Sequence, residues 1–270
     1  MDTVKIQLDE FQGIAKTMLA PFKYRVEGSL KKESAYSDPI GERFMEAIDF
    51  NWGAFTNKPA YWCVVVRTEI LDDEISAFIK DNPMAVIVNL GAGLCTRYHR
   101  IATDSIIWID IDLPEVIAFR QRLEEPKRAN HLFISGSILD FCWMDTVEAF
   151  KERPMLFIAE GILMYFDEDQ NKALFIALSE RFSNSGMVFE IISPLLMFFK
   201  NPFISEKFKW GINNIKHIES WNKGISIRNE WSYSARHIEL LPYTRRLAHR
   251  VLMLNNAMKI IQASFCINEI

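Results

Sequence analysis

Two glycines separated by one residue close an apolar segment near the middle of the chain. The stretch VIVNLGAGLCTR, residues 86–97, places Gly91 and Gly93 directly after the run VIVNL. Because glycine has no β-carbon, the backbone there can turn tightly and approach a ligand closely. Open parallel sheets bind ligands beyond the carboxyl ends of their strands. The pair therefore marks a candidate ligand-binding turn, although G-x-G also occurs in such turns for purely steric reasons.

Two aspartates lie about 20 residues beyond this turn, where nucleotide-binding folds place the acid that holds a ribose. They are Asp110 and Asp112, in the stretch SIIWIDID. A carboxylate there can accept hydrogen bonds from both ribose hydroxyls. Asp112 has a second interpretation, because Asp112-Leu-Pro-Glu115 matches a capping box that would begin the next helix. One oxygen could cap the helix while the other faces a ligand.

The next two apolar stretches also end in residues that could contact a ligand. Ser137 and Ile138 follow the third stretch and suit the edge and the face of an adenine ring. Glu160 ends the fourth, where a charge interrupts an apolar run. Because a buried carboxylate without a partner is costly, we expect Glu160 to face either a ligand amine or a neighbouring arginine.

These residues need a framework that brings strand ends together. Strands are predicted over residues 84–90, 105–112, 131–139, 154–161 and 186–193. Helices are predicted between them over residues 115–125, 143–151 and 167–183. This alternation of apolar strands and helices predicts an α/β fold, with a parallel sheet covered by helices on both faces.

The two ends of the chain have different patterns of apolar and polar residues. Apolar residues at helical spacing predict a helix over residues 4–18, then a turn-rich stretch, then a second helix over residues 60–80. Near the C-terminus, residues 225–235 and 258–267 alternate apolar and polar side chains, as paired edge strands do.

We therefore expect one domain over residues 1–270. Its predicted parts are a helical N-terminal extension (1–80), a sheet core (81–195 and 225–270) and an inserted lid or acceptor segment (196–224).

Composition excludes several classes of function. Of the 270 residues, 49% are hydrophobic and 24% charged, and the net charge is −4. No basic face dominates, so no nucleic-acid partner is expected, and the basic group at 245–250 fits a solvated helix face. No apolar run approaches the roughly 18 residues that span a membrane, and the acidic N-terminus argues against a signal peptide. We expect a soluble, cytoplasmic protein.

Cysteine and histidine are spread along the chain without motif spacing. They are Cys63, Cys95, Cys142 and Cys266, with His99, His131, His217, His237 and His249. We expect neither a metal site nor a disulfide, which fits a reducing cytoplasm.

Three motifs together resemble a known family. LGAGLCTR, WIDIDLPEVI and FIAEGILMYF, in this order and spacing, are similar to motifs of the leucine carboxyl methyltransferase family, which includes the tetracenomycin-type polyketide O-methyltransferases. The resemblance covers roughly residues 60–190, with Val66-Arg67-Thr68 as an upstream element. It implies a Rossmann-like class I methyltransferase with a seven-stranded, mostly parallel sheet. The implied cofactor is S-adenosyl-L-methionine (SAM), and the implied product is S-adenosyl-L-homocysteine.

The resemblance also implies which residues contact SAM. Arg67 would meet the SAM carboxylate, and Gly91 and Gly93 would line its methionine and ribose portion. Asp112 would hold the ribose, and Glu160 would face the methionine moiety.

The same resemblance places Ser137 and Ile138 beside the adenine.

Two positions depart from the family pattern. Cys95 stands where the usual motif has aspartate, which removes a negative charge beside a cationic cofactor. Ser137 stands where some relatives have aspartate.

SAM carries its own activated methyl group, so transfer is an in-line displacement that needs no metal and no protein nucleophile. The expected function is O-methylation of a carboxylate or hydroxyl of a small molecule, polyketide-like acceptors included. A carboxylate is already ionised at neutral pH, whereas a phenol, with a pKa of about 10, would benefit from a base. Tyr165, His217 and His237 are candidates for that base, and the sequence selects none of them as catalytic.

Two alternatives belong to other classes of function. A non-catalytic protein of the same fold, binding SAM or a partner, is suggested by Cys95. An NAD-dependent oxidoreductase is disfavoured, because Thr96 stands where the dinucleotide motif has its third glycine. The oligomeric state is left open.

The two ends of the chain are expected to roof the cofactor cleft and form the acceptor pocket. Something must cover the methyl group and exclude water from a displacement reaction, and residues 1–60 and 195–221 are available. The second segment carries an apolar load suited to such an acceptor: Phe198, Phe199, Phe203, Phe208, Trp210 and Trp221.

SAM or S-adenosyl-L-homocysteine should raise the melting temperature of the protein, because a ligand that binds only the native state stabilises it by mass action. NAD should leave the melting temperature unchanged. Thermal denaturation with each ligand checks this, and stabilisation by NAD without stabilisation by SAM would favour the oxidoreductase.

Overall fold

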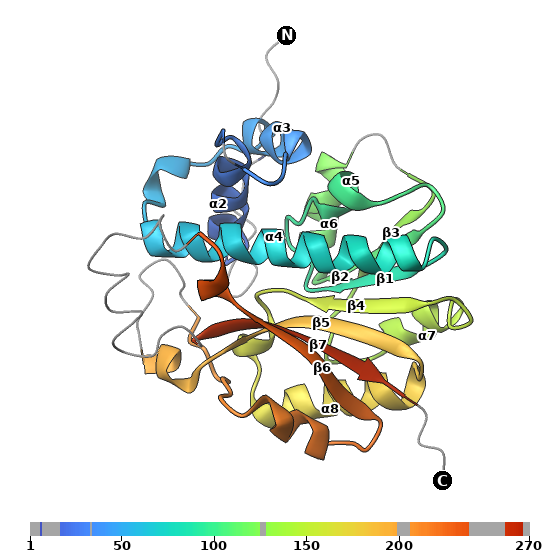
Figure 1. Ribbon diagram of the computed structural model, residues 1–270. Helices are drawn as coiled ribbons and strands as arrows, with labels where there is room; N and C mark the ends of the chain where they lie inside the picture. Colours follow the sequence, from blue (N-terminus) through green and yellow to red (C-terminus); the bar gives the residue numbers. More distant parts are fainter. Residues whose placement is uncertain are drawn as a thin grey trace.

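A seven-stranded sheet forms the centre of the fold, with strand order β3-β2-β1-β4-β5-β7-β6 (Figure 1). Strands β1 to β5 are parallel, and β7 lies antiparallel between β5 and β6. The strands are β1 Val86–Leu90, β2 Ile107–Asp112, β3 His131–Ser135, β4 Met155–Ala159, β5 Ser185–Ile192, β6 Ile225–Ser232 and β7 Met258–Phe265. This computed structural model describes residues 6, 17–32, 34–124, 128–198, 206–237 and 257–266.

The strand order reverses at β1, which pairs with β2 on one side and with β4 on the other. Every residue of β1 and β4 is buried, as expected for parallel strands that are covered on both faces. Gly91 follows the last residue of β1, so the predicted ligand turn lies at the point where open α/β sheets bind their ligands.

Helices cover both faces of the sheet. On one face α4 packs Trp62, Val66 and Ile70 into the core, and on the other α8 packs Leu174 and Leu178. Figure 1 shows α4 as a long helix across one side of the sheet and α8 along the other. The α-helices are α2 Leu19–Ser29, α3 Pro39–Ala47, α4 Lys58–Asp81, α5 Arg97–Ile101, α6 Pro114–Leu123, α7 Trp143–Glu148 and α8 Glu168–Arg181. Short 3-10 helices are η1 Trp52–Ala54, η2 Leu163–Tyr165, η3 Pro194–Phe198, η4 Ile215–Ser220 and η5 Tyr233–Ala235.

The predicted α/β class and the pairing of the last two strands are confirmed. The helix predicted over residues 60–80 is confirmed as α4, but the turn-rich stretch expected before it was wrong in part, because that stretch contains α2 and α3. Pro21 lies in the first turn of α2, where its missing N–H breaks no helical hydrogen bond. Asp38 caps α3 by accepting a hydrogen bond from the N–H of Gly41 at 2.9 Å. The helix expected over residues 4–18 lies largely outside the described residues.

Among the helices of the described residues, none is both long enough and apolar enough to cross a membrane. The longest of them, α4, has 24 residues and carries charged side chains along its length. Two of these, Arg67 and Asp72, form ion pairs with charged residues of other elements.

Candidate active site

A cavity of about 650 Å³ lies at the carboxyl ends of β1, β2, β3 and β4. This volume is in the range of pockets that hold small-molecule ligands. Its lining includes every cofactor contact that the sequence motifs imply: Arg67, Gly91, Gly93, Asp112, Ser137, Ile138 and Glu160. The fold therefore brings together on one cavity residues that are dispersed over the first two thirds of the chain.

Three glycines at strand ends adopt a left-handed backbone conformation. Gly91 and Gly93, after β1, have φ of +69° and +49°, and Gly161, after β4, has φ of +68°. A β-carbon on Gly91 would lie 2.9 Å from Cγ1 of Ile162, closer than side chains pack. Both the dihedral angles and the space therefore require glycine at this turn, and the backbone forms part of the cavity wall.

Asp112, the last residue of β2, joins that strand to the glycine turn. Its carboxylate accepts hydrogen bonds from the N–H of Gly93 at 2.6 Å and from the N–H of Leu113 at 2.7 Å. The expected helix cap does not form, since the N-cap of α6 is Leu113 and no side chain caps it. Burial raises the pKa of Asp112 to about 6.

Asp110, two residues earlier, has a different environment. Its carboxylate is fully buried and contacts Asn89, Trp108 and His131 at 2.9 Å each, and Arg120 at 3.2 Å. Burial alone would raise its pKa, but these contacts lower it to about 2. With every side of the carboxylate occupied and no part of it in the cavity lining, Asp110 holds the sheet edge together.

Charged side chains form a continuous series of ion pairs behind the glycine turn, hereafter the ion-pair series. In order they are Arg25, Asp38, Arg100, Asp72, Arg97, Glu160, Arg67 and Glu190. None of these side chains is more than 13% exposed. The signs alternate, so four arginines balance four carboxylates. Because buried charges are tolerated only when paired, each of these residues depends on its neighbours.

Glu160 lies inside the ion-pair series, directly after β4. Its oxygens lie 2.8 Å from Nε of Arg67 and 2.9 Å from Nη2 of Arg97. Burial alone would raise the pKa of Glu160, but the two guanidinium groups lower it to about 2. The sequence predicted either a ligand amine or a neighbouring arginine as the partner of Glu160, and the structure places arginines there.

Arg67 connects Glu160 to a second carboxylate. Its Nη1 lies 2.8 Å from Oε2 of Glu190, whose other oxygen accepts a hydrogen bond from the hydroxyl of Tyr233 at 2.7 Å. Burial would lower the pKa of Arg67, but Glu190 and Glu160 raise it above its ordinary value. The guanidinium stays charged in the cavity wall, close against Gly161.

Cys95 is buried in the glycine turn, and its sulfur accepts a hydrogen bond from Nη1 of Arg97 at 3.4 Å. Arg97 therefore obtains its two negative partners from Asp72 and Glu160 rather than from position 95. The substitution in the motif leaves this arginine fully paired.

Of the three candidate bases, Tyr165 alone lines the cavity. Burial raises the pKa of Tyr165 to about 12, so its hydroxyl is neutral and suited to hydrogen bonding rather than to taking a proton. His217 pairs with Glu168 on the surface at 3.1 Å, and His237 pairs with Glu69 at 2.7 Å.

Parts of both ends of the chain line the cavity. Phe22 and Tyr24 of α2 contribute from the N-terminal side, and Leu196 and Phe208 contribute from the segment expected to form the lid. The rings of Phe208 and Tyr165 meet edge to face with centroids 5.5 Å apart. The lining is therefore apolar and aromatic on this side.

Two tryptophans expected in the acceptor pocket lie in the core instead. Trp221 packs 5.5 Å from the ring of Phe175 in α8 and 6.1 Å from Trp210. The expectation was wrong for these two residues because an aromatic-rich sequence does not reveal which side chains face the sheet. Apart from Phe208, which lines the cavity, the remaining aromatics of that segment lie outside what the structure describes: the Phe198 side chain, Phe199 and Phe203.

Sequence reasoning missed Arg25 and Glu190, which also line the cavity. Glu190 interrupts the apolar strand MVFEII and so carries the same signal that identified Glu160. Arg25 lies on α2, a helix that was not predicted, and its partner Asp38 is 13 residues away in the chain. No local pattern marks that pair.

Known proteins resemble this chain in sequence and in fold. The sequence profile described as leucine carboxyl methyltransferase matches residues 25–179, which include all seven predicted contacts. The tetracenomycin polyketide synthesis O-methyltransferase TcmP of Streptomyces glaucescens is 29% identical over 227 residues, covering 82% of this chain and 83% of that protein. The S-adenosyl-L-methionine-dependent methyltransferase dpfgK of Gibberella zeae is 27% identical over 182 residues, covering 61% of each chain. A solved structure of a candidate methyltransferase from Thermobifida fusca shares the fold, with a TM-score of 0.58, 11% identity and coverage of 94% and 95%.

Asp112 and Asp110 form a matched pair for testing the cavity contact. Asp112→Ala should weaken SAM binding by about 10- to 100-fold, the effect of losing a charged hydrogen bond of roughly 1.5–3 kcal/mol. Asp110→Asn should instead lower the melting temperature and leave SAM affinity of the folded protein nearly intact, because its contacts are structural. Calorimetric titration and thermal denaturation of both variants separate the roles. Lost affinity in Asp110→Asn with full affinity in Asp112→Ala would reverse the assignment.

The raised pKa of Asp112 predicts that SAM binding depends on pH. Ribose hydroxyls would donate to the ionised carboxylate, which predominates above the pKa of about 6. Affinity should therefore fall by up to about tenfold between about pH 7 and about pH 5. The Asp112→Asn variant, which cannot titrate, should bind with a flatter dependence. A wild-type affinity that stays constant to about pH 5 would contradict the assignment.

Proposed function

The chain belongs to the leucine carboxyl methyltransferase family, and from this premise we propose that it methylates an oxygen atom of a small-molecule acceptor. It is a SAM-dependent methyltransferase with a seven-stranded, Rossmann-like sheet. In the proposed reaction the acceptor oxygen attacks the methyl carbon in line with the sulfonium. A C–O bond forms, the C–S bond breaks, and its electron pair stays on the sulfur of S-adenosyl-L-homocysteine.

The observation that supports the proposal most strongly is an ion pair in the wall of the cavity, at the point where the strand order reverses. The methionine moiety of SAM is a zwitterion, and Arg67 and Glu160 are a complementary pair 2.8 Å apart. In this proposal Arg67 would hold the SAM carboxylate and Glu160 would hold its ammonium. Asp112 would accept hydrogen bonds from the ribose hydroxyls, and Gly91 and Gly93 would leave room for the cofactor at the turn.

The adenine end of SAM is proposed to lie along the residues after β3. Ser137 and Ile138 line the cavity there, and Ile138 is 4% exposed. An isoleucine side chain can pack on the face of the ring, and the backbone and hydroxyl of Ser137 offer hydrogen-bonding groups to its edge.

The acceptor is proposed to have an apolar or aromatic body. Tyr165 and Phe208 form one wall, and Leu196 with Met258 extends it. The resemblance to a polyketide O-methyltransferase favours the same class of molecule. In this proposal the segment 196–224 and the N-terminal extension supply the acceptor side of a single domain.

We propose that the acceptor group is a carboxylate rather than a hydroxyl. A carboxylate is ionised at neutral pH, whereas a hydroxyl must lose a proton. Burial raises the pKa of Tyr165 and of Cys63 to about 12, and Glu160 is held ionised by Arg67 and Arg97. These three groups in the lining are unsuited to removing a proton from a hydroxyl near neutral pH.

The acceptor class is tested by measuring S-adenosyl-L-homocysteine formation with aromatic carboxylic acids beside the matching phenols. Turnover with the acids should be nearly flat between about pH 7 and about pH 9, because their ionisation is complete. Turnover confined to the phenols and rising with pH would overturn the preference for carboxylates. Methylation of nitrogen or carbon acceptors alone would overturn O-methylation.

Two neighbouring leucines test where the acceptor binds. Leu196 lines the cavity, whereas Leu195 is 57% exposed and does not. Leu196→Ala should raise the acceptor KM by about tenfold, the effect of losing roughly 1.5 kcal/mol of apolar contact, with SAM affinity unchanged. Leu195→Ala is the matched control and should behave as wild type. Equal KM values for the two variants would place the acceptor elsewhere.

A further inference from the structure

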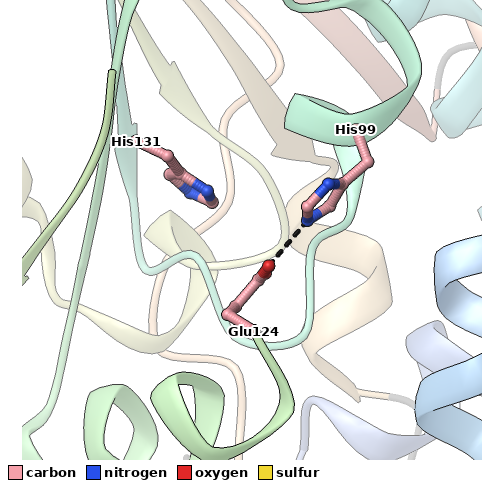
Figure 2. A group of neighbouring side chains, drawn as sticks. All are labelled: His99, Glu124 and His131. Atoms are coloured by element: carbon pink, nitrogen blue, oxygen red, sulfur yellow. Dashed lines mark hydrogen bonds and ion pairs between the residues drawn. The ribbon is translucent and has the colours of Figure 1, made fainter. Parts of the chain in front are cut away.

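A second cluster of side chains able to do chemistry lies outside the cavity lining. Figure 2 shows its three members, His99, Glu124 and His131, pointing toward one another. One ligand atom from each lies within 4.8 Å of the others. The residues come from α5, from the end of α6 and from the first position of β3. Because they lie far apart in sequence, no metal motif marks them, and the expectation of no metal site rested on that spacing alone.

The cluster is buried, and its members are held in place by outer partners. The side chains of His99, Glu124 and His131 are 15%, 5% and 2% exposed. Nε2 of His131 contacts Oδ2 of Asp110 at 2.9 Å, and Oε1 of Glu124 accepts from Arg120 at 2.7 Å. A carboxylate bonded to a ligating histidine is the common outer partner in metal sites, because it fixes the ring orientation.

Oε2 of Glu124, the oxygen that Arg120 leaves free, faces Nε2 of His99 at 2.7 Å. The ring of Tyr98 stacks on His131 with centroids 4.1 Å apart and packs edge-on to His99 at 5.1 Å. The two imidazoles and the carboxylate are therefore preorganised rather than free to turn.

Charge in this region favours a bound cation. Asp110 and Glu124 are two buried carboxylates, and Arg120 is the arginine that contacts both. With neutral histidines, the five residues carry one net negative charge, and uncompensated buried charge is costly. Two imidazoles and one carboxylate form a donor set that suits zinc and its neighbours better than magnesium or calcium.

We propose that His99, Glu124 and His131 bind one divalent transition-metal ion of the zinc class, with water in the open coordination position. The ion would tie α5, the end of α6 and β3 together. Arg120, which bonds Glu124, also donates to the carbonyl of Gly93 at 2.8 Å, so the site braces the glycine turn. Its role is structural, since none of its three ligands lines the cavity.

The test uses the full chain after dialysis against a chelator, with Co²⁺ as a spectroscopic probe and Zn²⁺ as competitor. Wild type should bind one Co²⁺ per chain with visible ligand-field absorption, lose that signal to Zn²⁺, and melt at a higher temperature with Zn²⁺. His99→Gln and Glu124→Gln should bind at least about tenfold more weakly, because each removes a ligand. A SAM-induced rise in melting temperature, or circular dichroism where SAM does not bind, verifies that each variant is folded.

His217→Gln is the matched control, because His217 also pairs with a glutamate, Glu168, but on the surface and outside the cluster. It should bind Co²⁺ as wild type does. Equal binding by all variants, or no stoichiometric binding by wild type, would overturn the proposal. Wild type that gains stability only on acidification would show that a proton, not a metal, balances the charge. None of these measurements depends on methyl transfer, so they stand or fall apart from the proposed function.

Discussion

Buried ion pairs of alternating sign are the constraint on which the cavity depends. The ion-pair series from Arg25 to Glu190 links α2, α4, α5 and the ends of β4 and β5, elements that share little sequence proximity. Removing one member of this balanced series leaves it with one uncompensated buried charge, and breaking a buried pair in this way costs about 3–5 kcal/mol. The N-terminal helices are therefore fastened to the sheet by charge as well as by the apolar contacts of α2 with α4. This is why they can serve as a fixed wall of the cavity rather than as a loose extension.

The same constraint suits the cavity to a zwitterionic ligand. An isolated ammonium or carboxylate that separated Arg67 from Glu160 would supply a new partner to only one of them and leave the other with a single partner, Glu190 or Arg97. A ligand that carries both charges close together, as an amino-acid moiety does, supplies a new partner to each residue at once. Glu190 contacts Arg67 at 2.8 Å and Arg97 contacts Glu160 at 2.9 Å, so each member of the pair has a second partner within the protein. Charge balance thus favours SAM over a ligand of a single sign.

How far the sequence predicts this structure depends on whether the signal is local. Strand periodicity and the glycine turn are local, so the sheet and the cavity residues along its carboxyl edge were predicted. Gly28 was taken as part of a turn-rich stretch although it lies in α2, because the packing that tolerates it is tertiary: Gly28 lies so close to Tyr36 and Val65 that a β-carbon would not fit. His99 precedes β2 and His131 begins β3, so the two come together through the arrangement of α5, β2 and β3. No metal-binding motif with a fixed sequence spacing predicts that contact.

The contrast between Asp110 and Asp112 shows what decides the role of a carboxylate in this fold. Both are aspartates of β2 and so have the same chemistry. Their spacing of two residues places both side chains on the same side of the strand. Asp110 lies where strands and helices surround it, and all of its hydrogen-bonding capacity is used within the protein. Asp112 is the last residue of the strand, and among the described residues its oxygens accept hydrogen bonds from the backbone N–H groups of Gly93 and Leu113. Position along the strand, rather than residue type, therefore separates the structural acid from the one that can meet a ligand. The same reasoning applies to Glu160, which follows the last residue of β4, and to Glu190, which lies beyond the last residue of β5 that pairs with β4 and also lines the cavity.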